Sequence, residues 1–281
     1  MPVIGNHLAI TNRHGPLRQL AVKEVNARKD RGTDRNDMLS KLFTLQKEKP
    51  DQLKHDDVVS TAVSNIFAGS DTTAISIRAI LYYLLKNPEC KRRLIDDIDR
   101  LREEGNLSDP VTLTEADSMP YLQAVMYEAL RLHPAVGMSL PRVVPEGGTT
   151  FNGIYLPAET IIGANPWVIH RNKEVYGEDV ETFRPERWMV EDKGDLRKCP
   201  VRHLLPSLLT ITTDRFFFAF GAGARTCIGK NISWMEMSKL IPTLFMHYNM
   251  ELANPDAEWV EECYWFVLQK GVNLRLSKRS V

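Results

Sequence analysis

Residues 220–229 read Phe220-Gly221-Ala222-Gly223-Ala224-Arg225-Thr226-Cys227-Ile228-Gly229 and precede a helix predicted at about 228–248. We call these ten residues the cysteine loop. Gly221 and Gly223 allow tight or positive-φ turns and a close approach of the backbone to a flat ligand. Cys227 stands where the loop meets the helix N-terminus, whose N–H groups and dipole favour a thiolate. Arg225 adds positive charge or binds an anionic group, and Gly229 leaves room beside the sulfur. A lone cysteine is usually a small buried hydrophobe, so it is the neighbours that indicate a ligand site.

A dinucleotide site is the alternative for such a glycine loop. The Gly-x-Gly-x-x-Gly fingerprint fails because Thr226 stands at the third glycine position, and no Gly-Lys-Ser/Thr follows as in a P-loop. Glu251 could bind a ribose, but the segment after the helix does not read as a convincing strand. The nucleotide interpretation is therefore weak.

Composition excludes several classes of function. The chain has 281 residues, with 36 Lys plus Arg and 36 Asp plus Glu, so it shows no basic excess for nucleic-acid binding. Its four cysteines lack a CxxC pair, which argues against a zinc ribbon or disulfide framework and fits a reducing compartment. There is neither an apolar run long enough to span a bilayer nor a signal peptide, so the chain as written is expected to be cytoplasmic.

The pattern of apolar residues predicts a mainly α protein with small β-sheets, an α+β fold. Residues 1–55 suggest one or two short helices. Longer helices are expected at 56–86, 89–103 and 119–132, the first ended by Asn87-Pro88. Short β-prone pieces follow at 142–144, 149–154 and 160–164, then an irregular stretch at 166–215 and a terminal hairpin at 263–276.

The cysteine loop resembles the haem-binding signature of the cytochrome P-450 family, Phe-x-x-Gly-x-Arg-x-Cys-x-Gly. Every defined position is filled, by Phe220, Gly223, Arg225, Cys227 and Gly229. The resemblance implies that Cys227 is the axial ligand of the iron of haem b and that Arg225 binds a haem propionate. A thiolate ligand pushes electron density onto the iron and favours O–O cleavage.

The family also carries a Glu-x-x-Arg pair on a helix, which Glu128 and Arg131 match. At 100° per residue the two side chains lie about 60° apart on an otherwise apolar helix. Such charges are buried, and they must be paired or the fold loses several kcal/mol. Pro185-Glu186-Arg187-Trp188 resembles the family's Pro-Glu-Arg-Phe segment, so Arg187 would complete a structural Glu–Arg–Arg network. Trp188 in place of Phe is a departure from that pattern.

The long helix contains Ala68-Gly69-Ser70-Asp71-Thr72-Thr73, which are poor residues for a helix interior. A kink or a wet patch would explain them without any function. The run also resembles the family's oxygen-binding groove, Ala/Gly-Gly-x-Asp/Glu-Thr. By that resemblance the helix opens locally at Gly69 to admit a diatomic ligand, Thr72 hydrogen-bonds the oxygen, and Asp71 relays protons from solvent.

Two smaller matches complete the comparison. Arg142 stands where many members place a second propionate-binding arginine on a short strand. His170-Arg171-Asn172 resembles the family's His-Arg-Asp segment, and we assign His170 a structural role. His133, His203 and His247 show no partner pattern.

The landmarks follow the family order, which implies a haem-thiolate monooxygenase. Such an enzyme inserts one atom of O₂ into a small apolar organic substrate, with electrons from NADPH through a reductase docked on the cysteine side. A haem-thiolate isomerase or dehydratase and a haem-binding protein without turnover are the alternatives. Phrases at 37–42 and 79–84 look most like fungal pisatin-demethylase-type members, which act in secondary metabolism.

Full members are far longer, and the difference lies before the oxygen helix. We therefore interpret residues 1–55 as a remnant of the helices preceding it and residues 56–281 as the haem-binding C-terminal core, with the N-terminal portion missing. The family expectation of the cytosolic face of the endoplasmic reticulum depends on an anchor that this chain lacks. We expect the isolated chain to hold haem weakly, since water exclusion and substrate positioning depend on the missing roof.

Overall fold

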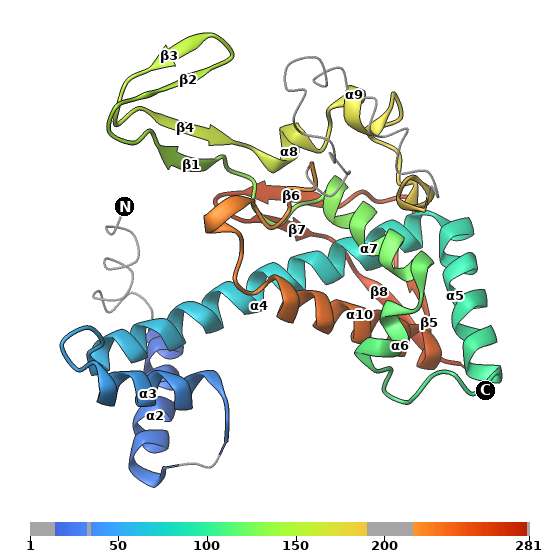
Figure 1. Ribbon diagram of the computed structural model, residues 1–281. Helices are drawn as coiled ribbons and strands as arrows, with labels where there is room; N and C mark the ends of the chain where they lie inside the picture. The colour runs from blue at the N-terminus through green and yellow to red at the C-terminus, as the bar shows by residue number, and fades with distance from the viewer. Residues whose placement is uncertain (1–14, 33–34, 190–215, 280–281) are drawn as a thin grey trace. The chain divides into compact units, whose positions relative to one another are not determined.

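The computed structural model describes residues 15–32, 35–189 and 216–279 (Figure 1). His203 and the C-terminal half of the predicted irregular stretch, at 190–215, lie outside the described residues. The chain forms two compact units, Met1–Asp71 and Thr72–Val281, and the boundary between them falls inside helix α4 (His55–Lys86). The domain boundary expected between residues 55 and 56 stays a prediction.

The first unit contains α2 (Gly15–Arg31), α3 (Met38–Glu48) and the first part of α4. Asp37 caps α3 because its side chain accepts a hydrogen bond from the backbone N–H of Ser40, which leaves one fewer unpaired donor at the helix start. Val25, Val58 and Val59 are buried and form the small core of this unit. Two helices therefore precede the long helix, where the sequence predicts one or two, and α2 is longer than expected.

The second unit is built around α7 (Pro120–Leu132), which is buried along most of its length. It is accompanied by α5 (Pro88–Glu103), α6 (Leu113–Asp117) and α10 (Lys230–His247). Proline occupies the first turn of α5 and α7, where its missing N–H costs nothing. Helix α10 packs against α5, α6 and α7. It begins two residues later than predicted, because Gly229 rather than Cys227 is its cap.

Short helices occupy the described part of the irregular stretch. They are α8 (Pro166–Ile169), α9 (Lys173–Tyr176) and the 3₁₀ turn η2 (Pro185–Trp188). Asn165 caps α8 and Asn172 caps α9, each by accepting a hydrogen bond from a backbone N–H of the first turn. In helices this short, such side-chain bonds satisfy backbone groups that have no partner within the helix.

Two antiparallel strand pairs follow α7. β1 (Leu140–Val143) pairs with β4 (Ile161–Ala164), and β2 (Thr149–Phe151) pairs with β3 (Ile154–Leu156). The prediction of one continuous β piece at 149–154 is wrong. Asn152 and Gly153 both have positive φ and form the two-residue turn of a hairpin, a geometry that Asn-Gly favours.

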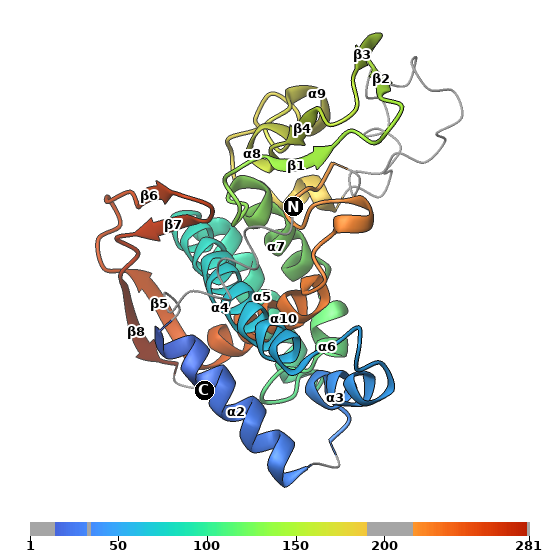
Figure 2. The same cartoon turned by 90° about the vertical axis from the view of Figure 1, so that its left-hand side faces the viewer.

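The C-terminal strands also differ from the expectation. The hairpin joins β6 (Val260–Cys263) to β7 (Val267–Lys270), and β8 (Leu274–Lys278) pairs instead with β5 (Tyr248–Leu252), directly after α10. Burial of Met250 and Leu252 on alternate positions stabilises β5, and Gly271, at a φ of 88°, turns the chain between β7 and β8. Figure 2 shows both strand pairs on the same side of α7 and α10.

Helix α4 is regular over its whole length, so the local opening expected near Gly69 is not seen in this structure. Ser70 and Ser76 instead donate side-chain hydrogen bonds to the carbonyls of Ile66 and Thr72, four residues earlier, which accommodates both serines within the helix. In the part of the chain that the structure describes, none of the helices combines the length and apolar character that a bilayer span requires.

Candidate functional site

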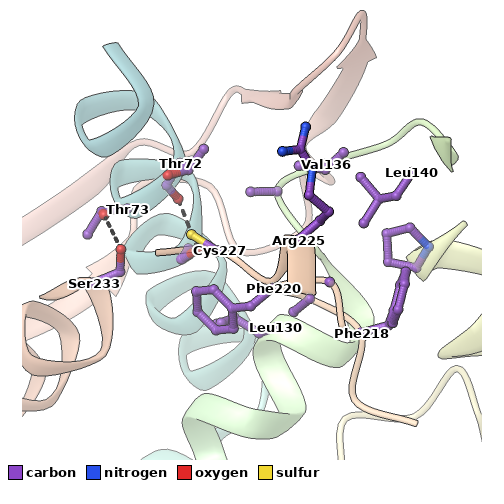
Figure 3. Close-up of a pocket in the computed structure, with 15 residues that line it drawn as sticks. Thr72, Thr73, Leu130, Val136, Leu140, Phe218, Phe220, Arg225, Cys227 and Ser233 are labelled. Atoms are coloured by element: carbon purple, nitrogen blue, oxygen red, sulfur yellow. Dashed lines mark hydrogen bonds between the residues drawn. The ribbon is translucent and has the colours of Figure 1, made fainter. Parts of the chain in front are cut away.

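A cavity of about 200 Å³ in the second unit joins segments far apart in the sequence (Figure 3). Its walls come from α4, the end of α7, β1, the cysteine loop and the start of α10. Most of the lining is apolar, with a few polar groups among them. The lining includes Thr72, Thr73, Ser76, Leu130, Val136, Leu140, Phe218, Phe220, Gly221, Arg225, Cys227 and Ser233.

Thr72 and Cys227 both line this cavity. Figure 3 shows Thr72, from α4, near Cys227, from the cysteine loop, and the Thr72 carbonyl accepts a hydrogen bond of 2.9 Å from Ser76, one turn further along the helix. Cys227 is an exposed free thiol, and its backbone N–H donates a hydrogen bond of 2.9 Å to the carbonyl of Phe220, which closes the loop. The predicted oxygen-side and iron-side residues thus lie at one site.

The loop glycines differ in what they contribute. Gly221 and Gly223 have φ values of 70° and 69°, which most other residues avoid. A Cβ on Gly221 would also come within 3.3 Å of Leu140. A Cβ on Gly229 would lie 3.8 Å from the Cys227 sulfur, an ordinary contact. The backbone therefore requires Gly221 and Gly223, whereas Gly229 is not required by space in this structure.

The two predicted propionate ligands occupy different positions. Arg225 is exposed and lines the cavity, at the end of the 3₁₀ turn η5 (Gly223–Arg225). Arg142 is half-buried on β1, donates 2.8 Å to the carbonyl of Pro141, and is not among the lining residues. Leu140, two positions earlier on the same strand, does line the cavity. Because alternate strand residues share a face, Arg142 lies on the face that borders the site.

The remaining predicted residues of α4 lie outside the cavity wall. Asp71 immediately precedes Thr72 and is exposed to solvent. Gly69 is exposed too, and a Cβ there would meet no heavy atom within 4 Å. The structure therefore brings Thr72, Phe220, Gly221, Arg225 and Cys227 together in the lining of one cavity. Asp71 and Gly69 are close to Thr72 in the sequence but do not line the cavity.

Glu128, Arg131 and Arg187 form a buried ion-pair network. The guanidinium of Arg131 contacts both carboxylate oxygens of Glu128 at 2.9 Å, and the Nε of Arg187 donates to Oε1 at 2.8 Å. Arg131 also donates to the carbonyls of His170 and Val180. These bonds satisfy the buried charges and tie the segment containing α8, α9 and η2 to α7.

Some contacts at the site were not expected from the sequence. The indole N–H of Trp188 donates 2.8 Å to Glu128, so the departure from the Pro-Glu-Arg-Phe pattern supplies an extra donor. Thr73 donates 3.2 Å to Ser233 of α10, which links the two helices that border the cavity. A polar residue on an otherwise apolar helix face is the signal that could have indicated the Thr73 contact.

Comparison with known proteins identifies the family. The Cytochrome P-450 family profile matches residues 5–275. The chain belongs to the cytochrome P-450 family. It is 38% identical to cytochrome P-450 monooxygenase hepC of Aspergillus oryzae, with 98% of this chain and 51% of the relative covered. It is 42% identical to pisatin demethylase of Fusarium vanettenii, with 83% and 41% covered, and 42% identical to cytochrome P-450 monooxygenase cicH of Emericella nidulans, with 87% and 46% covered.

This cytochrome P-450 chain spans about half the length of the curated relatives it matches. Membership in the family implies a haem iron with a thiolate ligand. The mainly α fold with small antiparallel sheets agrees with the family fold that the sequence predicts.

The residues at the cavity fit such a group chemically. A free thiol faces an apolar space bordered by an arginine, and among the described residues no group of three or more His, Cys, Asp or Glu side chains competes as a metal site. The cavity volume of about 200 Å³ is smaller than the 300–1,000 Å³ of typical ligand pockets.

Proposed function

We propose that this cytochrome P-450 chain binds haem through Cys227 and acts as a monooxygenase on a small apolar organic substrate. The presence of Thr72 and Cys227 in the lining of one cavity is the observation that carries the proposal. Thiolate-bound haem supplies the chemistry of O–O cleavage. One oxygen atom would enter the substrate and the other would leave as water.

In this proposal the residues of the chain hold the cofactor and move protons. Cys227 binds the iron, and Arg225 and Arg142 hold the haem propionates as charge-assisted donors. The Thr72 hydroxyl holds a proton at the cavity wall, and Asp71, exposed on the solvent side of the same helix, replaces it from water. Glu128, Arg131 and Arg187 keep the segment around η2 against the core.

We further propose that electrons come from NADPH through a reductase that docks on the face bearing Cys227. Exposure supports this face, since Ile228 beside the ligand is 92% exposed. The relatives that carry the name pisatin demethylase suggest demethylation as the first reaction to test, and we choose small aromatic methyl ethers as simple apolar substrates that carry a methyl group. By family resemblance we expect the reaction at the cytosolic face of the endoplasmic reticulum.

The test is product formation by the haem-loaded chain with NADPH, an NADPH-dependent reductase and isotopically labelled dioxygen. A panel of small aromatic methyl ethers serves as substrate, and mass spectrometry records the label. We expect one labelled oxygen atom in each product hydroxylated on the ring, and none in a demethylated product, because there the inserted oxygen leaves with the methyl carbon as formaldehyde. We expect no product of either kind when NADPH is omitted. Product without NADPH would favour an isomerase or dehydratase. Haem binding without any product from the panel would favour a non-catalytic haem protein.

The Thr72→Val variant tests the proposed proton path, with Thr61→Val as its matched control. Both threonines lie on α4, but Thr61 is outside the cavity and donates only to the carbonyl of Asp57. Losing a positioned proton donor typically costs about 10²-fold or more in rate. We expect that loss for Thr72→Val and an unchanged rate for Thr61→Val. Equal rates in the two variants would remove Thr72 from the mechanism.

A further inference from the structure

His170 lies between α7 and the segment that leads into the cysteine loop. Its side chain is completely buried. The ring Nδ1 lies 2.9 Å from the carbonyl oxygen of Arg131, and the backbone N–H of Phe218 donates to Nε2 at 2.8 Å. The ring also stacks on Phe217, with 5.5 Å between centroids and 10° between planes. One side chain therefore connects the Glu128 network to the chain that carries the thiol.

The two hydrogen bonds determine the tautomer of His170. A backbone N–H can only donate, so Nε2 must accept and Nδ1 must carry the hydrogen that is donated to Arg131. Burial lowers the pKa of His170 to about 3, and the neighbouring guanidinium groups of Arg131 and Arg171 act in the same direction. The imidazole is therefore neutral at physiological pH, and its acceptor faces the loop.

The position of Phe218 is passed on to Cys227 by the backbone. The carbonyl of Phe218 accepts a hydrogen bond of 3.0 Å from the N–H of Gly221, which forms the first turn of the loop. The carbonyl of Phe220 accepts 2.9 Å from the N–H of Cys227. A change in the position of Phe218 therefore alters the turn at the start of the cysteine loop, and with it the backbone that holds Cys227.

We propose that His170 is a positioning residue for the thiolate: anchored on Arg131, it fixes the backbone of Phe218 and thereby the place of the Cys227 sulfur. This inference rests on the proposed function, because the thiolate matters only if it binds haem. It assigns to His170 a role toward the ligand loop in addition to packing in the core.

Two substitutions separate the two hydrogen bonds. In His170→Gln the side-chain oxygen reaches the position of Nε2 and can still accept from Phe218. In His170→Asn the shorter amide reaches the position of Nδ1, so it keeps the bond to Arg131 and loses Phe218. The matched control is His133→Asn, which changes another completely buried histidine that contacts Gln269 and not the loop.

Two readouts are measured on the full chain. The first is the ratio of thiolate-ligated to other haem, from the red-shifted Soret band of the reduced carbon monoxide complex. The second is the hydrogen-exchange rate of the Phe218 amide, which needs no haem. We expect His170→Asn to lower the ratio about tenfold and to speed the exchange of the Phe218 amide. A tenfold change corresponds to the loss of one buried hydrogen bond. His170→Gln and His133→Asn should keep both close to wild type.

The outcomes separate this inference from the proposed function. If wild type lacks the thiolate band, the proposed function fails, while Phe218 exchange still tests the contact. If wild type has the band and the two His170 variants behave alike in both readouts, the positioning role is wrong. A fall in the ratio for His133→Asn equal to that for His170→Asn would also overturn it, because general loosening of the core would then explain both.

Discussion

The Glu128 carboxylate accepts hydrogen bonds from the side chains of Arg131, Arg187 and Trp188 and from the backbone N–H of Arg184. Neither Glu128 nor Arg131 has exposed side-chain area. Removing one member of a buried ion pair leaves its partner charged without compensation, which costs more than the pair contributes. The network therefore makes the fold sensitive to single substitutions.

Glu128→Gln keeps the volume of the side chain and removes its charge. We expect it to lower the free energy of unfolding by about 3–5 kcal/mol, since Arg131 and Arg187 remain buried. Its control is Glu186→Gln, which breaks a half-exposed pair with Arg93 and should cost about 0–1 kcal/mol. Urea denaturation measures both, and equal losses would mean that the buried charges are not what holds α7 to η2.

Trp188→Phe restores the family's usual residue and removes one donor to Glu128. Hydrogen bonds to charged groups contribute about 1.5–3 kcal/mol, against 0.5–1.5 kcal/mol for neutral ones. Trp234→Phe is the comparison, because the indole of Trp234 donates to the neutral side chain of Gln123. We expect the larger stability loss for Trp188→Phe, and the reverse order would show that the Trp188 bond adds little.

Acidification should destabilise the fold through its buried histidines. Burial lowers the pKa of His170 to about 3 and that of His133 to about 4. The unfolded chain therefore binds protons at a higher pH than the folded chain, and the stability present above about pH 6.5 is lost as pH falls toward these values. Glu261, whose pKa burial raises, lies 3.6 Å from His133 and acts in the opposite direction.

The contribution of His170 to this pH dependence is the difference between the slopes, in free energy of unfolding against pH, of wild type and His170→Gln. Between pH 6 and 4.5, the wild-type free energy of unfolding should fall more steeply, by up to about 1.4 kcal/mol per pH unit. Urea midpoints at several pH values measure both slopes. Parallel slopes would mean that folding does not lower the pKa of His170.

At the scale of elements, α4 combines a regular helix with a glycine that no packing requires. A Cβ on Gly69 would meet nothing within 4 Å, and glycine costs a helix interior about 0.5–1 kcal/mol relative to alanine. Gly69→Ala should therefore stabilise the chain by about that amount and, if the space beside the helix serves haem, weaken haem binding.

Gly137→Ala is the contrasting variant. Its Cβ would overlap the Cys263 sulfur and lie 2.6 Å from a methyl of Val267, so the substitution should cost about 1–3 kcal/mol by overpacking against the β6–β7 hairpin. Thermal unfolding and haem titration distinguish the two glycines. If Gly69→Ala strengthens haem binding as well as stability, Gly69 has no part in the site.

The same elements show what could be predicted from the sequence. Helices α4, α5 and α7 follow from apolar periodicity and from prolines at their boundaries. The pairing of β5 with β8 does not, because it joins short strands over a long sequence separation and depends on how Met250 and Leu252 pack. The turn at Asn152-Gly153 was available as a sequence signal and was missed.

At the scale of the whole molecule, the sequence indicated which residues should meet at one site and not how each is held. Thr72 and Cys227 lie 155 positions apart in the numbering, yet both line one cavity, as the motifs led us to expect. The contact of His170 with the backbone N–H of Phe218 could not be predicted, because every residue except proline has such an N–H and the sequence does not show which one a side chain meets. The hydrogen bond from the indole of Trp188 to Glu128 could not be predicted either, because in the sequence Trp188 is only a departure from the motif.

The most direct test of the thiolate assignment is the carbon monoxide difference spectrum of the reduced, haem-loaded chain. Wild type and Cys263→Ser, which changes another exposed free thiol, should both show the red-shifted Soret band of thiolate-ligated haem. Cys227→Ser should abolish it. A wild-type spectrum without that band, or a Cys227→Ser spectrum that keeps it, would contradict the assignment of Cys227 as the iron ligand.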